Sequence, residues 1–255
     1  MRKLLLAGAL PALTFAVPAA AQDNYVQVGI GADYSTGDYG EEISTDFLAV
    51  PVSFKLQRGD FNVRVSIPYL DVTGPSEVIP GDGGVRGGSP DDPVVSRSGL
   101  GDVVAAATYS LALDQATFFD VTGKVKLPTA SQSDFLGTGT TDFTLQGEVL
   151  RVFGSTSAAL RAGRRFNGSS ELYPLQDVWL AGAGVYHALG STTLGLDYDW
   201  RQGSLPTAPD RSELTGSVTQ KLSDALRLQG YVYTGFSEGS PDIGAGAQVL
   251  VRMAN

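Results

Sequence analysis

The sequence feature that most constrains the fold is an alternation of apolar and polar residues in short segments after residue 22. Residues 61–67 (Phe-Asn-Val-Arg-Val-Ser-Ile) and 225–232 show it clearly. Successive side chains of a β-strand point to opposite faces, so each segment would have one apolar and one polar face. Charged residues such as Arg64 and Arg227 fall on the polar face, which a soluble barrel would bury but a membrane barrel keeps in a wet interior. The alternation therefore favours a transmembrane β-barrel.

Residues 1–21 have the pattern of an export signal. Two cations precede an apolar stretch from Leu4 to Val17, and Ala19-Ala20-Ala21 fits a small-residue cleavage site. A transmembrane helix needs roughly 20 apolar residues, more than this stretch offers, and no later segment is long enough either. We therefore predict export, removal of residues 1–21, and one barrel domain over residues 22–255.

Composition limits the partners and cross-links of the chain. The net charge is −9, and removing residues 1–21, with two cations and no anion, gives −9 − 2 = −11. An acidic chain without a basic block is a poor ligand for nucleic acid, so no nucleic-acid partner is expected. The chain has no cysteine, so disulfides do not contribute to its stability.

Twelve segments are expected to form strands, and the connections between them alternate between very short turns and longer loops. This asymmetry is typical of up-and-down barrels of the outer membrane. We therefore predict an all-β fold, a twelve-stranded antiparallel up-and-down transmembrane β-barrel, with both chain ends on the side of the short turns. The expected strands span residues 24–35, 44–57, 61–70, 101–113, 116–127, 142–153, 156–166, 177–188, 191–202, 212–222, 225–236 and 242–253. The expected long loops span 36–43, 71–100, 128–141, 167–176, 203–211 and 237–241.

Charged residues fall on one parity within these segments, and apolar residues fall on the other. A charge facing lipid near the midplane would cost about 2–4 kcal/mol, so the charged parity should line the lumen. The residues predicted to line the lumen and to contact a solute in transit are Arg64, Lys124, Lys126, Glu148, Arg161, Arg165, Asp197, Asp199, Arg201 and Arg227.

Aromatic residues gather near the ends of the expected strands, as in the aromatic girdles of membrane barrels. Ordinary enrichment of aromatics in strands is the alternative explanation. The girdle on the long-loop side would comprise Tyr34, Tyr69, Phe143, Trp179, Trp200 and Phe236. The girdle on the short-turn side would comprise Tyr25, Phe54, Phe61, Tyr109, Phe118, Phe153 and Tyr186.

A soluble periplasmic β-sandwich is the competing architecture, because it would also alternate and carry an export signal. Its inner face would be apolar and uncharged, and its loops would not sort into short and long sets. Both features disagree with this sequence, so the sandwich is the weaker interpretation.

No arrangement of reactive residues in the sequence predicts an enzyme. The single histidine, His187, lies at the short-turn end of a strand, far from where a barrel lipase would place a Ser–His pair. Asp197 and Asp199 could act as an acid–base pair, but an interior salt-bridge network with Arg161, Arg165 or Arg227 is preferred. Asp91-Asp92, in the expected 71–100 loop, match no calcium-loop spacing and are interpreted as solvated acids. We predict no catalytic residue, no metal site and no cofactor.

Three stretches carry a resemblance to a known family. The first is Ile67-Pro68-Tyr69-Leu70 with Ser98-Gly99-Leu100-Gly101-Asp102 after a long loop, the second is Lys124-Val125-Lys126-Leu127-Pro128-Thr129, and the third is Leu136-Gly137-Thr138-Gly139 leading to Asp142-Phe143. In order and spacing they resemble the outer-membrane transporter family of the phenol meta-degradation pathway. The resemblance implies a barrel that passes aromatic or other small hydrophobic compounds, and it supplies no catalytic residues.

One feature departs from the usual pattern of outer-membrane barrels. Their last strand commonly ends in an aromatic residue that the barrel-assembly machinery reads, whereas this chain ends Arg252-Met253-Ala254-Asn255. The expected partners remain outer-membrane lipid, that machinery and a small-molecule solute, in the outer membrane of a Gram-negative cell. The predicted function is a passive channel or uptake barrel for small molecules. The alternative is a structural or ligand-binding barrel that transports nothing because salt bridges close its lumen. The 71–100 loop would fold partly inward in either case.

Overall fold

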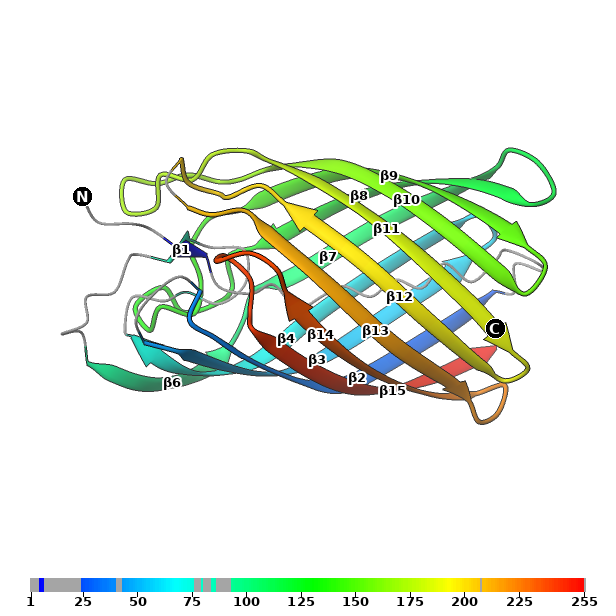
Figure 1. Ribbon diagram of the computed structural model, residues 1–255, viewed down its shortest axis with the longest axis horizontal. Coiled ribbons are helices and arrows are strands. Elements are labelled where there is room, and N and C mark those ends of the chain that lie inside the picture. Colours follow the sequence, from blue (N-terminus) through cyan, green and yellow to red (C-terminus); the bar gives the residue numbers. More distant parts are fainter. Residues whose placement is uncertain are drawn as a thin grey trace.

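The computed structural model describes residues 5–6, 24–39, 43–75, 79, 84–85, 93–206 and 208–254. These residues form a closed antiparallel β-barrel with twelve strand positions around it (Figure 1), which confirms the predicted fold class. The described part of the chain contains no helix that is long and apolar enough to cross a bilayer. Most of the predicted export signal and Asp91-Asp92 lie outside the described residues.

The barrel follows the chain from strand to neighbouring strand and closes where the last strand pairs with the first. Each strand of the main barrel is antiparallel to its neighbours, and β15 pairs with β2 along its whole length. A separate two-residue ladder joins β1 (Leu5–Leu6) to β5 (Gly84–Val85). The barrel strands are β2 (Tyr25–Gly37), β3 (Thr45–Arg58), β4 (Phe61–Pro75), β6 (Val94–Leu100), β7 (Val103–Ala112), β8 (Thr117–Leu127), β9 (Asp142–Phe153), β10 (Thr156–Phe166), β11 (Val178–Leu189), β12 (Thr192–Arg201), β13 (Arg211–Lys221), β14 (Leu226–Gly235) and β15 (Ile243–Ala254).

Strands β6 and β7 share one position around the barrel, and the prediction was wrong at this point. The sequence predicted a loop over 71–100, but β4 continues to Pro75 and pairs there with β6, so the two form an extension beyond the predicted strand ends. The chain bends between β6 and β7, where the Gly101 N–H donates to the carbonyl of Pro68. The other edge of β6 pairs with no described strand. Glycine and proline next to these segments gave the sequence the signature of a loop, although a short edge strand tolerates both.

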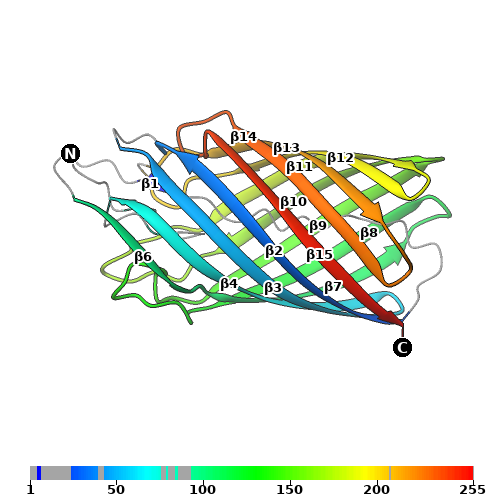
Figure 2. The same cartoon turned by 90° about the horizontal axis from the view of Figure 1, so that it is seen from below.

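The two ends of the barrel differ in the length of their connections (Figure 2). At one end, the short-turn end, strands are joined by two to four residues, and both β2 and β15 have their terminal residues there. The opposite end, the long-loop end, carries the longer connections, including residues 128–141. The alternation predicted from the sequence is therefore confirmed.

The two faces of the wall follow the predicted parity. On β2, Ile30 is 54% exposed, whereas Asp33 is 4% exposed. The same contrast separates Leu160, which is 69% exposed, from Arg161 beside it on β10, whose side chain is 14% exposed. Large exposed apolar side chains cover the outer face of every barrel strand, which is the surface a bilayer requires.

Three of the predicted girdle aromatics face inward instead. Tyr186 is 5% exposed and packs on the inner wall with Leu150 and Ala159, and Phe118 packs against the same cluster. Tyr25 also has the inward parity and lies against the cations Lys55 and Arg252. Their place near strand ends suggested a girdle, but parity decides the face, and all three have the parity of the charged residues.

Candidate functional site

Arg161, on β10, contacts three carboxylates on the inner wall. Its Nη2 and Nε atoms lie 2.8 and 3.0 Å from the two oxygens of Asp199, a bidentate pairing that fixes the guanidinium plane. Its Nη1 atom lies 3.2 Å from Asp197 Oδ1 and 3.8 Å from Glu148 Oε2. The predicted salt-bridge network of Asp197 and Asp199 with Arg161 is thus confirmed, and Glu148 joins it.

Strand register explains why these groups meet. Arg161 lies opposite Gly182 of β11, and Gly182 lies opposite Asp199 of β12, so arginine and aspartate are two strands apart. The guanidinium crosses the glycine to reach the carboxylate, because a Cβ on Gly182 would touch Arg161 Nε. Tyr186 donates its hydroxyl hydrogen to Asp197 from the same strand as the glycine. A missing side chain on β11 thus permits an ion pair across it.

A second carboxylate, Asp33 of β2, is held by two tyrosines of β14. The hydroxyls of Tyr231 and Tyr233 donate to its two oxygens at 2.8 and 2.9 Å. Both rings lie across β15, where Gly244 and Gly246 leave room that a Cβ would occupy. This group spans the closure of the barrel between its last strands and its first strand.

A third group joins the strands at the long-loop end. The ammonium of Lys126 lies 2.8 Å from Asp142 Oδ2 and 3.3 Å from Asp102 Oδ2, and it donates to the Thr138 hydroxyl. Lys126 and Asp142 are both buried, and Asp102 is nearly so. The other oxygen of Asp102 accepts the backbone N–H of Ala130, which fixes the start of the loop over residues 128–141. The ion pairs therefore join the ends of β7, β8 and β9, and the hydrogen bonds of Ala130 and Thr138 attach the loop to them.

The stretches that carry the family resemblance converge on this junction. Asp102 belongs to the first stretch, Lys126 to the second, and Thr138 and Asp142 to the third. Thr129 of the second stretch accepts the N–H of Val103 and donates to the carbonyl of Gly101. Residues distant in the sequence thus form one connected polar site.

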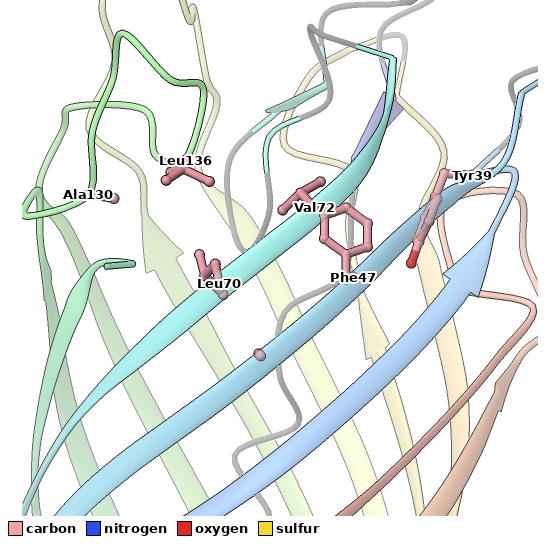
Figure 3. Packing of buried hydrophobic residues seen from close by; sticks show 7 residues of the cluster. Tyr39, Phe47, Leu70, Val72, Ala130 and Leu136 are labelled. Carbon is pink, nitrogen blue, oxygen red and sulfur yellow. The ribbon is translucent and has the colours of Figure 1, made fainter. Parts of the chain in front are cut away.

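Apolar side chains beside this junction hold the 128–141 loop against the inner wall (Figure 3). Leu136 of the loop packs with Leu70 and Val72 of β4 and with Phe47 of β3, and Tyr39 meets Phe47 edge-on at 5.6 Å. These strand residues face inward, because their neighbours Leu48 and Tyr69 are exposed on the outer face. Burial raises the pKa of the Tyr39 hydroxyl to about 12, so this hydroxyl stays protonated and neutral. The 128–141 loop therefore contacts the inner wall. Ile79, within the expected 71–100 loop, is also buried, against Tyr173, Leu175 and Leu205.

The remaining predicted lumen residues lie on the inner face but outside the Arg161 network. Arg165 and Arg201 are buried toward the long-loop end, and Lys124 of β8 and Arg64 of β4 both lie opposite Ala106 of β7. Arg64 and Arg227 form no ion pair with any described carboxylate, unlike Lys126 and Arg161. Lys126 and Arg161 thus pair with carboxylates, whereas Arg64 and Arg227 do not pair with any described carboxylate.

The prediction of the site missed several contributors. Asp102 and Asp142 lie at strand ends, where parity does not assign a face, although both stood in the stretches that carry the resemblance. Asp33 and Glu213 have the lumen parity, but nothing in the sequence pairs them with Tyr231 or with Arg211. His187 accepts or donates a hydrogen bond at 2.8 Å with the Thr156 hydroxyl on the exposed face near a short turn.

No family model matches the sequence, and no curated protein matches it. Among solved structures, an outer membrane channel from Pseudomonas putida F1 is similar with a TM-score of 0.74 at 14% identity, covering 96% of this chain and 100% of that one. The β domain of the Bordetella autotransporter BrkA has a TM-score of 0.58 at 12% identity, covering 91% and 100%. The KdgM porin in complex with disordered oligogalacturonate has a TM-score of 0.53 at 8% identity, covering 89% and 99%. At these identities the likeness shows the fold: this chain has the architecture of outer-membrane β-barrels.

Proposed function

We propose that this chain is a passive channel of a Gram-negative outer membrane for small organic molecules. One observation carries the proposal: a closed barrel has an apolar outer surface and an inner wall lined by charged side chains. A twelve-stranded barrel has a lumen wider than the filled core of an eight-stranded one and narrower than a sixteen-stranded porin. Such a lumen suits small solutes.

The sidedness and the solute class are part of the same proposal. The short-turn end would face the periplasm and the long-loop end the exterior, as in other outer-membrane barrels. The resemblance to transporters of phenol degradation, together with the charged Arg161 network on the inner wall, favours solutes that combine an aromatic body with a polar group. Residues 1–21 would direct export and then be removed.

Conductance in planar lipid bilayers tests the channel directly. The purified chain should give ion-conducting steps, and proteoliposomes should admit small aromatic acids faster than protein-free liposomes do. Heat-treated protein serves as the control, because it has the same composition without the barrel. If neither conductance nor solute entry is seen, the channel proposal fails.

A second candidate function, a barrel that transports nothing, is favoured by one observation. The 128–141 loop packs on the inner wall through Leu136 and accepts a hydrogen bond from Lys126 through Thr138, so it would narrow the long-loop end. In that case Arg161→Ala should lower thermal stability and leave solute entry at the background rate. A change of ion selectivity or of flux in Arg161→Ala would instead favour the channel.

A further inference from the structure

We propose that the short-turn end of the lumen contains a binding site for the carboxylate group of small organic acids. The site consists of Lys55, Arg64, Arg227 and Arg252, which we call the basic arc. It deepens the proposed channel function by naming the solute class and rests on that function, but binding to the arc can be measured separately from transport.

Strand register places the four cations side by side. Arg252 of β15 lies opposite Gln27 of β2, Gln27 lies opposite Lys55 of β3, and Lys55 lies directly opposite Arg64 of β4. Directly opposed positions bring Cβ atoms within about 5.5 Å. Arg227 of β14 lies opposite Leu250, which places it diagonally next to Arg252. All four side chains have the parity of the lumen, so four neighbouring cations face the same space.

The ring of Tyr25 lies among these cations. The Cζ atom of Arg252 is 3.7 Å from the ring centroid, and the Nζ atom of Lys55 is 5.7 Å from it. Cations over a ring face are attracted by its quadrupole, which holds both side chains toward the β2 wall. Tyr25 thus orients two of the charges without neutralising them.

No described carboxylate forms an ion pair with any member of the basic arc. Asp120 acts electrostatically on Lys55, and Asp224 acts on Arg227, but Asp224 pairs with Lys221 at 2.6 Å instead. Arg227 and Arg252 also repel each other, and the buried Nε of Arg252 has no hydrogen-bond acceptor. By contrast, the guanidinium of Arg161 and the ammonium of Lys126 each contact at least two carboxylates.

This arrangement costs stability in the absence of an anion. Like charges at directly opposed strand positions are destabilising, and Lys55 and Arg64 hold such positions. A carboxylate would relieve the repulsion, and arginine offers it two parallel N–H donors. The geometry therefore favours an organic carboxylate.

Calorimetric titration of the full chain, folded in neutral detergent at constant ionic strength, tests the site. The probes are sodium benzoate, its uncharged isostere benzamide, and inorganic phosphate. Benzoate should bind at least tenfold more tightly than benzamide, because a hydrogen bond to a charged group contributes about the free energy of one decade in affinity. Benzoate should also bind more tightly than phosphate.

The variants decide which residues form the site. Lys55→Gln with Arg252→Gln should weaken benzoate binding at least tenfold, since two of the four cations are removed. Arg58→Gln is the matched control: it removes one positive charge from the same strand and the same end of the barrel, on an exposed residue of opposite parity. Arg58→Gln should bind benzoate as the wild type does. The double variant should unfold at the same or a higher denaturant concentration, because repulsion within the arc is reduced.

Each other outcome counts against the site in a defined way. Equal binding of benzoate and benzamide, or equal weakening by Arg58→Gln, would overturn it. Tighter binding of phosphate would show a site for inorganic oxyanions and would overturn the choice of organic acids. A lower unfolding midpoint in the double variant would show a structural role for the arc. Channels that conduct but bind no benzoate would refute this inference alone, whereas benzoate binding without any conductance would refute the proposed function alone.

Discussion

The two ends of the lumen treat charge in opposite ways. At the long-loop end, the ammonium of Lys126 lies between Asp102 and Asp142 in a buried group that attaches a loop to three strands. At the short-turn end, Lys55, Arg64, Arg227 and Arg252 face one another without an ion pair to any described carboxylate. Buried charges that pair with opposite charges favour one arrangement of the chain. Neighbouring like charges without such partners cost stability, and they therefore indicate a binding site for an anion. Burial and pairing, more than the number of charges, therefore separate the structural end from the candidate binding end.

The largest expected loss of stability is at the long-loop end, where the buried charges form ion pairs. Lys126→Ala leaves Asp102 and Asp142 buried without their cation, and breaking a buried pair in this way costs about 3–5 kcal/mol. Urea unfolding of the folded barrel in detergent measures the loss. Lys221→Ala is the control, because its ion pair with Asp224 is exposed and should contribute little. Equal losses in the two variants would remove the distinction between buried and exposed pairs.

Leu136 tests whether packing holds the loop as the hydrogen bonds of Ala130 and Thr138 do. Leu136→Ala removes a side chain that is 2% exposed, and a lost core leucine typically costs about 2 kcal/mol or more. The loop should leave the inner wall more often, so we expect larger or more frequent conducting steps in planar bilayers. Leu172→Ala, on an exposed leucine of another long loop, should leave conductance unchanged. A smaller conductance in Leu136→Ala would show that the loop does not narrow the lumen.

The Arg161 network is an intermediate case between the two ends. Arg161→Ala leaves Asp197, Asp199 and Glu148 without their shared cation, and charged hydrogen bonds contribute about 1.5–3 kcal/mol. Because Asp199 is half exposed, we expect a loss of about 1.5 kcal/mol in urea unfolding, below that of Lys126→Ala.

Arg164 is the matched control for Arg161, since it lies on the same strand with the opposite parity. It pairs with Asp177 at 3.1 Å near Trp179 on the outer face, where the side chain is 43% exposed. Arg164→Ala should change stability by at most about 1 kcal/mol. A larger loss for Arg164 than for Arg161 would contradict the view that inward ion pairs hold the wall together.

Much of the barrel could be predicted from the sequence, because the two-residue alternation of side chains along a strand determines which face each residue occupies. Alternation fixes which residues of a strand share a face. It therefore predicted the strands, the outward position of Ile30 and the inward position of Asp33. It also predicted that Arg161, Asp197 and Asp199 share the inner face. Where parity and position near a strand end disagreed, as for Tyr25 and Tyr186, parity decided the face.

The rest of the site depends on strand register and tertiary packing, which the alternation of residues does not specify. The contact of Arg161 with Asp199 requires a two-strand register and a glycine between them, and register is set by partners far away in the sequence. Asp102 and Asp142 lie at strand ends, and the inward position of the 128–141 loop depends on tertiary packing with Leu70 and Val72. The like-charge neighbours Lys55 and Arg64 are likewise visible only once the register is known.

The smallest expected effect concerns a matched charge at the short-turn end itself. Asp114 caps the turn between β7 and β8: its oxygens accept the N–H of Ala116 at 2.7 Å and the N–H and hydroxyl of Thr117 at 2.8 and 2.9 Å. The hydrogen bonds from Ala116 and Thr117 lower the pKa of Asp114, and the charge of Arg151 adds to this. A carboxyl whose pKa is lower in the folded state stabilises the fold above its unfolded pKa of about 4, and this contribution is lost as the pH falls through the folded pKa.

We therefore expect Asp114→Asn to lower the urea midpoint slightly at neutral pH, where the wild-type carboxylate is ionised. The difference between the two proteins should shrink below about pH 4, because the wild type then loses the same charge. Urea unfolding across this pH range measures the difference, and it should be smaller than that of Arg161→Ala because the turn is exposed. A difference that grows on acidification would have the wrong sign. It would show that the charge of Asp114 opposes folding, so that its hydrogen bonds to Ala116 and Thr117 do not favour the ionised carboxylate.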